Sequence, residues 1–214
     1  MKDYLLFIDT ETSGLPKRWD LPYTNNLNWP YAVQIAWIIY RPDGTEVKRE
    51  NQYVNEKDIV IGKNSIKVHG ITEDFLQKNG KRRKEILRKL AYDIKKYDPL
   101  IIGHFVELDI HVLSADYLRS RIKNPFECSS FFCTMLKSAQ YARNPRVKYL
   151  RLSQLYEFLF NEHPINLHHA EKDAELTANC FFELLKREQI YTEDIQSQQE
   201  YFSKQLNILK KQVS

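Results

Sequence analysis

The chain has 214 residues, 32 of them basic and 28 acidic, and a formal net charge of +4. This length favours one domain with a well-filled core, and the charge balance permits a polyanionic partner without requiring one. Three cysteines without metal-type spacing favour a reduced, cytoplasmic protein. No stretch approaches eighteen apolar residues and the first strand begins directly after Tyr4, so we expect neither a membrane span nor a signal peptide.

The apolar run at residues 5–8 ends in Asp9-Thr10-Glu11-Thr12 and predicts a strand buried on both faces. Asp9 and Glu11 lie two residues apart, so an extended backbone points both carboxylates to the same side. Two charges about 5 Å apart repel by roughly 3 kcal/mol at an effective dielectric near 20. A hard cation such as Mg²⁺ or Mn²⁺ would relieve that repulsion. Taken alone, such a pair is more often an ordinary exit from a strand, so its partners decide the interpretation.

Residues 15–30 hold three prolines, three asparagines and two tryptophans, and predict a long loop suited to substrate contacts. Residues 32–40 and 45–54 predict two strands of an antiparallel hairpin around a turn at 41–44. Residues 55–81 are polar, and we expect this segment to be irregular, with residues 68–72 ending in a helix cap at Thr72.

Apolar residues recur every three or four positions over 83–97 and predict an amphipathic helix with a basic outer face. We interpret its basic cluster, residues 81–84, as a solvated surface, with nucleic-acid contact as the less favoured alternative. Residues 99–104 predict a buried strand and residues 108–121 a helix. Residues 131–135 predict a strand or a helix start, and helices follow at about 150–159 and 169–187. Strands alternating with helices after a hairpin indicate an α/β fold with a mixed sheet.

The tail, residues 189–214, also has a helical pattern. Packing on its own domain and a role in partner binding or dimerisation are about equally favoured. We therefore divide the chain into a domain at 1–187 and a helical tail at 188–214.

Two further acidic positions follow predicted elements. Asp109 comes just after the strand at 99–104, where an acid can also serve as a cap or a first-turn residue of a helix. His168 and Asp173 enter the helix near residue 169. Each position is a weak signal alone, but together with Asp9 and Glu11 they can converge on one site.

In this order the motifs resemble those of the DnaQ-like, or DEDD, 3′–5′ exonucleases, in the branch whose fifth active-site residue is histidine. The resemblance spans roughly residues 4–187. Three motifs carry it, at Phe7–Leu15, Ile102–Asp109 and His168–Asp173, with minor likenesses at 33–36 and 69–72. It implies a ribonuclease-H-like α/β fold, with a central five-stranded mixed sheet flanked by helices.

The resemblance also implies the site. Two divalent ions, Mg²⁺ or Mn²⁺, would be held by four carboxylates: Asp9, Glu11, Asp109 and Asp173. His168 would be the general base. Five residues would contact the terminal nucleotide: Thr10, Thr12, Leu15, His69 and Phe105. Phe105 stands where the family usually has asparagine; packing in the core is the favoured role for a lone phenylalanine, and stacking on a base or sugar is the alternative.

The implied activity is release of nucleoside 5′-monophosphates from DNA 3′ ends, in proofreading or repair. The implied partners are single-stranded DNA and, as further options, a DNA polymerase subunit or a second copy of the chain. The alternatives are an exoribonuclease of the same fold and a non-catalytic nucleic-acid-binding relative. The second is disfavoured because all four acids and the histidine are present.

The adjacent histidines give a geometric prediction. On a continuous helix His169 would share a face with Asp173, whereas the family spacing selects His168. His168 should therefore precede the helix.

Overall fold

The computed structural model describes residues 1–165 and 167–210, the last five by their backbone alone. Within these residues, five strands form one mixed sheet in the order β3-β2-β1-β4-β5. The strands are β1 (Leu5–Thr12), β2 (Ala32–Tyr40), β3 (Glu46–Tyr53), β4 (Leu100–Gly103) and β5 (Ser130–Cys133). The central strand β1 runs antiparallel to β2 and parallel to β4. The predicted mixed five-stranded sheet and its opening hairpin are confirmed.

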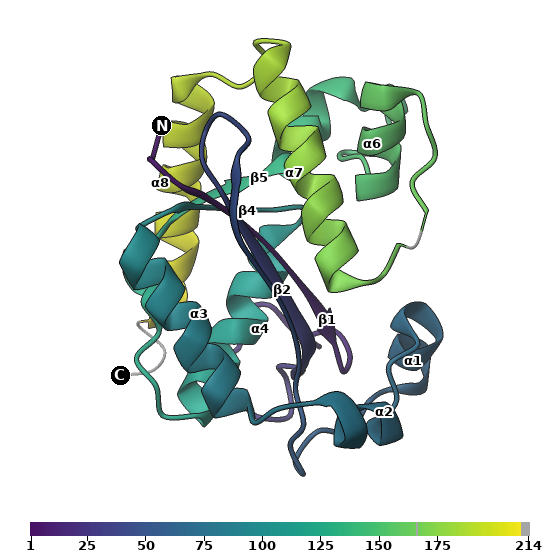
Figure 1. The fold of residues 1–214 in the computed structure, drawn as a ribbon, viewed down its shortest axis with the longest axis vertical. Coiled ribbons are helices and arrows are strands. Elements are labelled where there is room, and N and C mark those ends of the chain that lie inside the picture. Colours follow the sequence, from purple (N-terminus) through teal and green to yellow (C-terminus); the bar gives the residue numbers. More distant parts are fainter. Residues whose placement is uncertain (166, 211–214) are drawn as a thin grey trace.

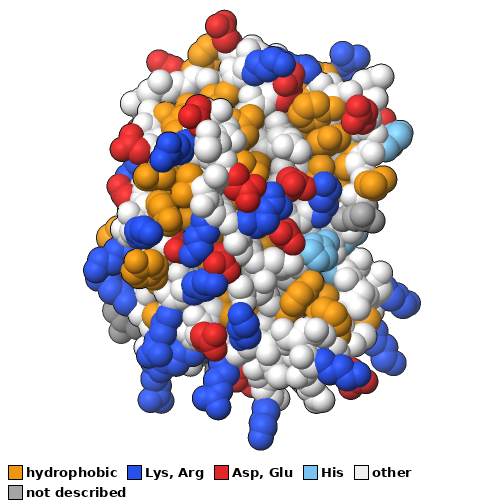
Figure 2. Space-filling view, viewed as in Figure 1, with side chains coloured by type: hydrophobic (Ala, Val, Ile, Leu, Met, Phe, Trp, Pro, Cys, Tyr) orange, Lys and Arg blue, Asp and Glu red, His pale blue; other side chains and the backbone are white. Residues whose placement is uncertain are grey.

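Helices cover both faces of this sheet (Figure 1). Because side chains alternate along β1, Leu6 and Ile8 enter one core with α3 (Arg83–Tyr97) and α4 (Val106–Arg119). Leu5 and Phe7 enter the other core with α6 (Leu152–Phe160) and α7 (Ala170–Lys186). A 3₁₀ turn, Pro125–Cys128, precedes β5, and a short helix, α5 (Thr134–Lys137), and a second 3₁₀ turn, Ser138–Tyr141, connect β5 to the segment before α6. Basic side chains gather over α3 in Figure 2, as its sequence pattern predicts.

The expectation of an irregular segment at residues 55–81 is wrong. It contains two short helices, α1 (Lys63–His69) and α2 (Glu73–Asn79). The cap at Thr72 is present, since its hydroxyl accepts the Phe75 N–H. None of the residues of α1 is fully buried, so this helix has no apolar periodicity for the sequence to reveal.

A buried ion cluster fixes the loop before β2. The Arg119 guanidinium donates to the carbonyl oxygens of Trp29 (2.6 Å) and Pro30 (2.9 Å) and to the fully buried Asp116 (2.8 Å). It also lies 4.1 Å from the centre of the Tyr31 ring. The loop therefore ends at a fixed position beside α4, although it has no regular secondary structure of its own.

The C-terminal helix α8 (Thr192–Lys210) packs against β5, an edge strand of the sheet. The Gln198 side chain accepts the Cys133 N–H at 2.6 Å and donates to the Cys133 carbonyl at 3.2 Å, so it pairs with the strand edge. Phe202 is buried in the core. The tail thus packs on its own domain as far as it is described; residues 211–214 lie outside the described residues. No helix of the described chain is long and apolar enough to cross a membrane.

Candidate active site

Three carboxylates converge at the end of the central strand. Asp9 and Glu11 lie on the same face of β1, and Asp173 reaches them from the first turns of α7. Among the described residues these three form a group whose candidate ligand oxygens lie within 4.8 Å of one another. Glu11 and Asp173 are each 8% exposed, and Asp9 is half-buried. The predicted convergence of the first and third motifs is therefore present in the fold.

The group carries more negative charge than its surroundings compensate. Burial, followed by the charges of Asp109, Asp173 and Glu11, raises the pKa of Asp9 well above its usual range. Burial, then Asp173 and Asp109, raises the pKa of Glu11 to about 8. Oδ1 of Asp173 is buried and has no hydrogen-bond partner among the described residues. An unpartnered oxygen in a set of hard carboxylate ligands fits a divalent cation of the Mg²⁺ type.

Asp109 lies beside this group, in the first turns of α4. It is buried, and the Thr10 hydroxyl donates to its Oδ1 at 2.7 Å. Thr10 stands between Asp9 and Glu11 on β1, so its side chain points to the opposite face, where α4 packs. Burial raises the pKa of Asp109 to about 7, although the Thr10 hydroxyl bond opposes that shift. The fourth predicted acid is thus near enough to affect Asp9 and Glu11 but is tied to Thr10.

The two histidines point to different partners. Helix α7 begins at Ala170, so His168 precedes it, with φ of +65°. The His168 backbone N–H donates to Oδ2 of Asp173 at 3.1 Å, and its side chain lines the cavity described below. Nε2 of His169 instead lies 3.1 Å from the Tyr53 hydroxyl. His168 therefore has the position that the motif spacing predicts, before the helix and next to Asp173.

A cavity of about 710 Å³ opens beside Glu11 and His168. Four of the five residues predicted to bind substrate line it: Thr10, Thr12, Leu15 and His69. Leu15 is 73% exposed and offers an apolar surface. The segment containing α1 forms a further part of the wall, through Gly62, Lys63, Asn64, Ser65 and Val68. The sequence missed this wall because it gave no sign of α1.

His69 has a structural part in this wall. Its Nε2–H donates to the Thr12 carbonyl at 3.2 Å, and its Nδ1 accepts the Ile71 N–H at 3.0 Å. Burial lowers the pKa of His69, which favours the neutral ring that these two bonds require. His69 thereby ties α1 to the end of β1, and its ring nitrogens are already occupied.

Phe105, the fifth residue predicted to bind substrate, does not line the cavity. It precedes α4 with φ of +71°, is half-buried, and its ring centre lies 5.7 Å from that of Trp19. Trp19 belongs to the 15–30 loop and also contacts Trp29 and His111. The structure thus favours packing as the role of Phe105.

The five-stranded mixed sheet in the order β3-β2-β1-β4-β5, with helices on both faces, is a ribonuclease-H-like α/β fold. A family model described as "Exonuclease" (RNase_T) matches residues 6–181, and the chain belongs to this family of DnaQ-like exonucleases. No curated protein sequence matches the chain at a significant level.

Solved structures show the same fold. Escherichia coli exonuclease I in complex with a dA16 oligonucleotide superposes with a TM-score of 0.68 at 17% identity, over 86% of this chain and 41% of that one. A full-length 3′-exonuclease superposes with a TM-score of 0.69 at 17% identity, over 87% of this chain and 83% of that one. A 3′-exonuclease recognising the 3′ end of a histone mRNA stem-loop superposes with a TM-score of 0.68 at 15% identity, over 87% of this chain and 64% of that one. The chain thus spans about two fifths of the exonuclease I chain.

Proposed function

We propose that the protein is a 3′–5′ exonuclease that releases nucleoside 5′-monophosphates from single-stranded nucleic acid, with DNA as its substrate. The observation that supports this most is the group of Asp9, Glu11 and Asp173, whose ligand oxygens lie within 4.8 Å of one another beside a nucleotide-sized cavity. Family membership supports the same reaction class.

Asp9, Glu11 and Asp173, with Asp109 beside them, would hold two divalent ions, Mg²⁺ or Mn²⁺. Bound there, divalent cations supply Lewis-acid stabilisation of the charge that develops on the phosphate. The carboxylates alone would repel a phosphodiester anion, so we expect hydrolysis to depend on added metal.

The remaining roles fall to the cavity and to His168. The exposed Leu15 would contact the base or sugar of the terminal nucleotide, and Thr12 would lie beside it. His168 would accept a proton from the attacking water, since it stands at the cavity wall next to Asp173 and precedes the helix.

One assay tests the proposal. Purified protein is incubated with Mg²⁺ or Mn²⁺ and with 5′-labelled single-stranded DNA, duplex DNA with a mismatched 3′ end, or RNA. We expect the label to remain on products that shorten one nucleotide at a time, on single-stranded DNA first. Faster degradation of RNA would overturn the choice of substrate, and no degradation of any of the three would overturn the activity. Asp9→Asn serves as the inactive control.

The histidine assignment has its own test. We expect His168→Ala to lower kcat by roughly two to four orders of magnitude, the usual contribution of a general base. His169→Ala should lose less than about tenfold, because its side chain contacts Tyr53 rather than the cavity. Both variants are measured at saturating Mn²⁺, and the assignment is wrong if His169→Ala is the more impaired.

A further inference from the structure

The start of α7 lacks a cap from its own sequence. The first N–H groups of any helix have no acceptor within the helix, and the N-cap residue His169 makes no side-chain capping bond. The Ala170 N–H donates instead to Oε1 of Gln34, at 3.2 Å. Gln34 lies on β2 and is fully buried, so the sheet supplies the cap that the helix lacks.

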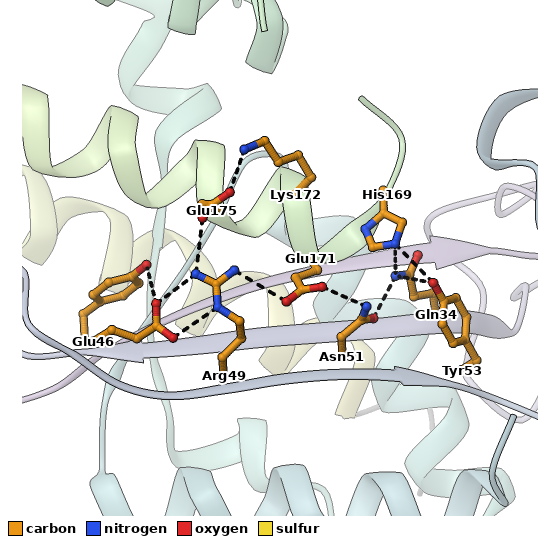
Figure 3. Close-up of polar contacts among 10 residues, drawn as sticks. Gln34, Glu46, Arg49, Asn51, Tyr53, His169, Glu171, Lys172 and Glu175 are labelled. Atoms are coloured by element: carbon orange, nitrogen blue, oxygen red, sulfur yellow. Dashed lines mark hydrogen bonds and ion pairs between the residues drawn. The ribbon is translucent and has the colours of Figure 1, made fainter. Parts of the chain in front are cut away.

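The other end of the Gln34 amide is also held. Its Nε2 donates to Oδ1 of Asn51 at 2.8 Å and lies 3.3 Å from Nε2 of His169 and 3.4 Å from the Tyr53 hydroxyl. Figure 3 shows these groups meeting between β2, β3 and the start of α7. Because both ends of the amide have partners, the side chain has one orientation, with its oxygen toward the helix.

Strand β3 extends the same contact along α7. Every second residue of the strand points to the same face, and on β3 this face carries Arg49, Asn51 and Tyr53. Nδ2 of Asn51 donates to Glu171 at 3.0 Å, and Arg49 pairs with Glu171 at 3.5 Å and with Glu175 at 3.3 Å (Figure 3). The first two turns of α7 are therefore joined to the edge of the sheet by polar side chains.

In the sequence, Ala170 lies between His168 and Asp173, the two groups on this segment that the proposed chemistry needs. Ala170 follows His168 by two residues and precedes Asp173 by three. The His168 N–H donates to Oδ2 of Asp173, and the Asp173 N–H donates to the His169 carbonyl. A displacement at Ala170 would therefore move both the carboxylate of Asp173 and the backbone of His168.

We propose that Gln34 is a positioning residue that, with Asn51 and Tyr53, fixes the start of α7 and so sets Asp173 against Asp9 and Glu11. The inference rests on the proposed function for its kinetic consequence. Carboxylates that hold Mg²⁺ must meet short, nearly fixed ligand distances, and groups that orient ligands typically change metal affinity or activity by about 10–100-fold when removed.

The test compares Gln34→Met with Gln52→Met. Both substitutions replace a glutamine by methionine. Gln52 lies between Asn51 and Tyr53 on β3, so its side chain points to the other face of the strand. Its amide donates to Glu50 and not to α7. We expect Gln34→Met to lower kcat on single-stranded DNA by about 10–100-fold and to raise the Mn²⁺ concentration for half-maximal activity by about tenfold. KM for DNA should stay within about twofold, because Thr12 and Leu15, the residues proposed to contact the nucleotide, lie outside α7 and its contacts. Gln52→Met should match the wild type.

A merely structural role predicts a different pattern. Gln34→Met would then lower Tm while the folded enzyme kept its kcat and its Mn²⁺ dependence, and that result would overturn the proposal. Equal effects from Gln52→Met would overturn it too. If Gln34→Met does not fold, Tyr53→Phe decides: we expect a loss of several-fold in kcat, and wild-type values would refute the positioning role.

Hydrogen exchange separates this inference from the proposed function. We expect the amides of residues 168–173 to exchange at least about tenfold faster in Gln34→Met than in the wild type or Gln52→Met, since Ala170 loses its acceptor. Unchanged exchange would overturn the proposal whatever the activity. If the wild type degrades no nucleic acid, the proposed function fails, and the exchange rates still decide whether Gln34 fixes α7.

Discussion

Replacing Glu11 by glutamine should stabilise the metal-free protein. Glu11 is 8% exposed and shares its position with Asp9 and Asp173, whose oxygens lie within 4.8 Å of its own. Two unit charges at 4.8 Å repel by about 3 kcal/mol at an effective dielectric near 20. Glutamine keeps the shape of the side chain and removes the charge.

The gain should depend on pH. The pKa of Glu11 is raised from 4.5 to about 8 in the fold, so between these values the folded wild type binds a proton that the unfolded chain has released. Wild-type stability therefore falls as pH rises through this window, and the glutamine variant lacks this loss. The two proteins should be about equal in stability below pH ~4.5 and should differ by about 3–5 kcal/mol above pH ~8, the lower figure from the repulsion alone and the upper from the raised pKa of the buried carboxyl.

Thermal melts in EDTA measure this difference. At about 2–4 °C per kcal/mol for a chain of this size, Glu11→Gln should melt about 6–20 °C above the wild type at pH ~8.5. With Mg²⁺ at a hundred times its dissociation constant the wild type should gain roughly 2.7 kcal/mol, and the variant should gain less. Glu162→Gln, at an exposed position, is the control and should change little. A lower melting temperature for Glu11→Gln in EDTA, or a difference that does not vary with pH, would refute the repulsion.

Three other substitutions test the supports of the site. Thr10→Val removes the hydroxyl that holds Asp109 and should lower kcat about tenfold at saturating Mn²⁺. Arg119→Met leaves the buried Asp116 without its 2.8 Å partner and should cost about 3 kcal/mol of unfolding free energy in urea melts. Gly103→Ala puts a Cβ 2.8 Å from a side-chain carbon of the first residue of α4 and should lower stability by about 1–3 kcal/mol.

Each of these has a matched control. Thr24→Val and Arg88→Met change exposed positions, and Gly14→Ala adds a Cβ with no heavy atom within 4 Å. If a variant and its matched control give the same result, the residue concerned does not support the site as inferred.

Local pattern in the sequence determined the strands of the sheet, the longer helices and the first carboxylate pair. The alternation of β1 places Asp9 and Glu11 on one face whatever packs around them. The 3.6-residue periodicity of residues 83–97 coincides with the bounds of α3. The family's motif spacing, rather than helical periodicity, selected His168 as the histidine that precedes the helix, where the structure has it. These features depend on neighbours in sequence, so single-sequence reasoning reaches them.

Tertiary packing decided which groups meet. The bond from Thr10 to Asp109 joins residues 99 positions apart, and the bond from Ala170 to Gln34 joins residues 136 apart. Helix α1 has no fully buried residue, so no apolar periodicity predicted this helix or the part of the cavity wall that it forms. Such contacts follow from how the sheet and the helices pack. Periodicity in the sequence reports local secondary structure and does not indicate which residue, about 100 positions away, a side chain will contact.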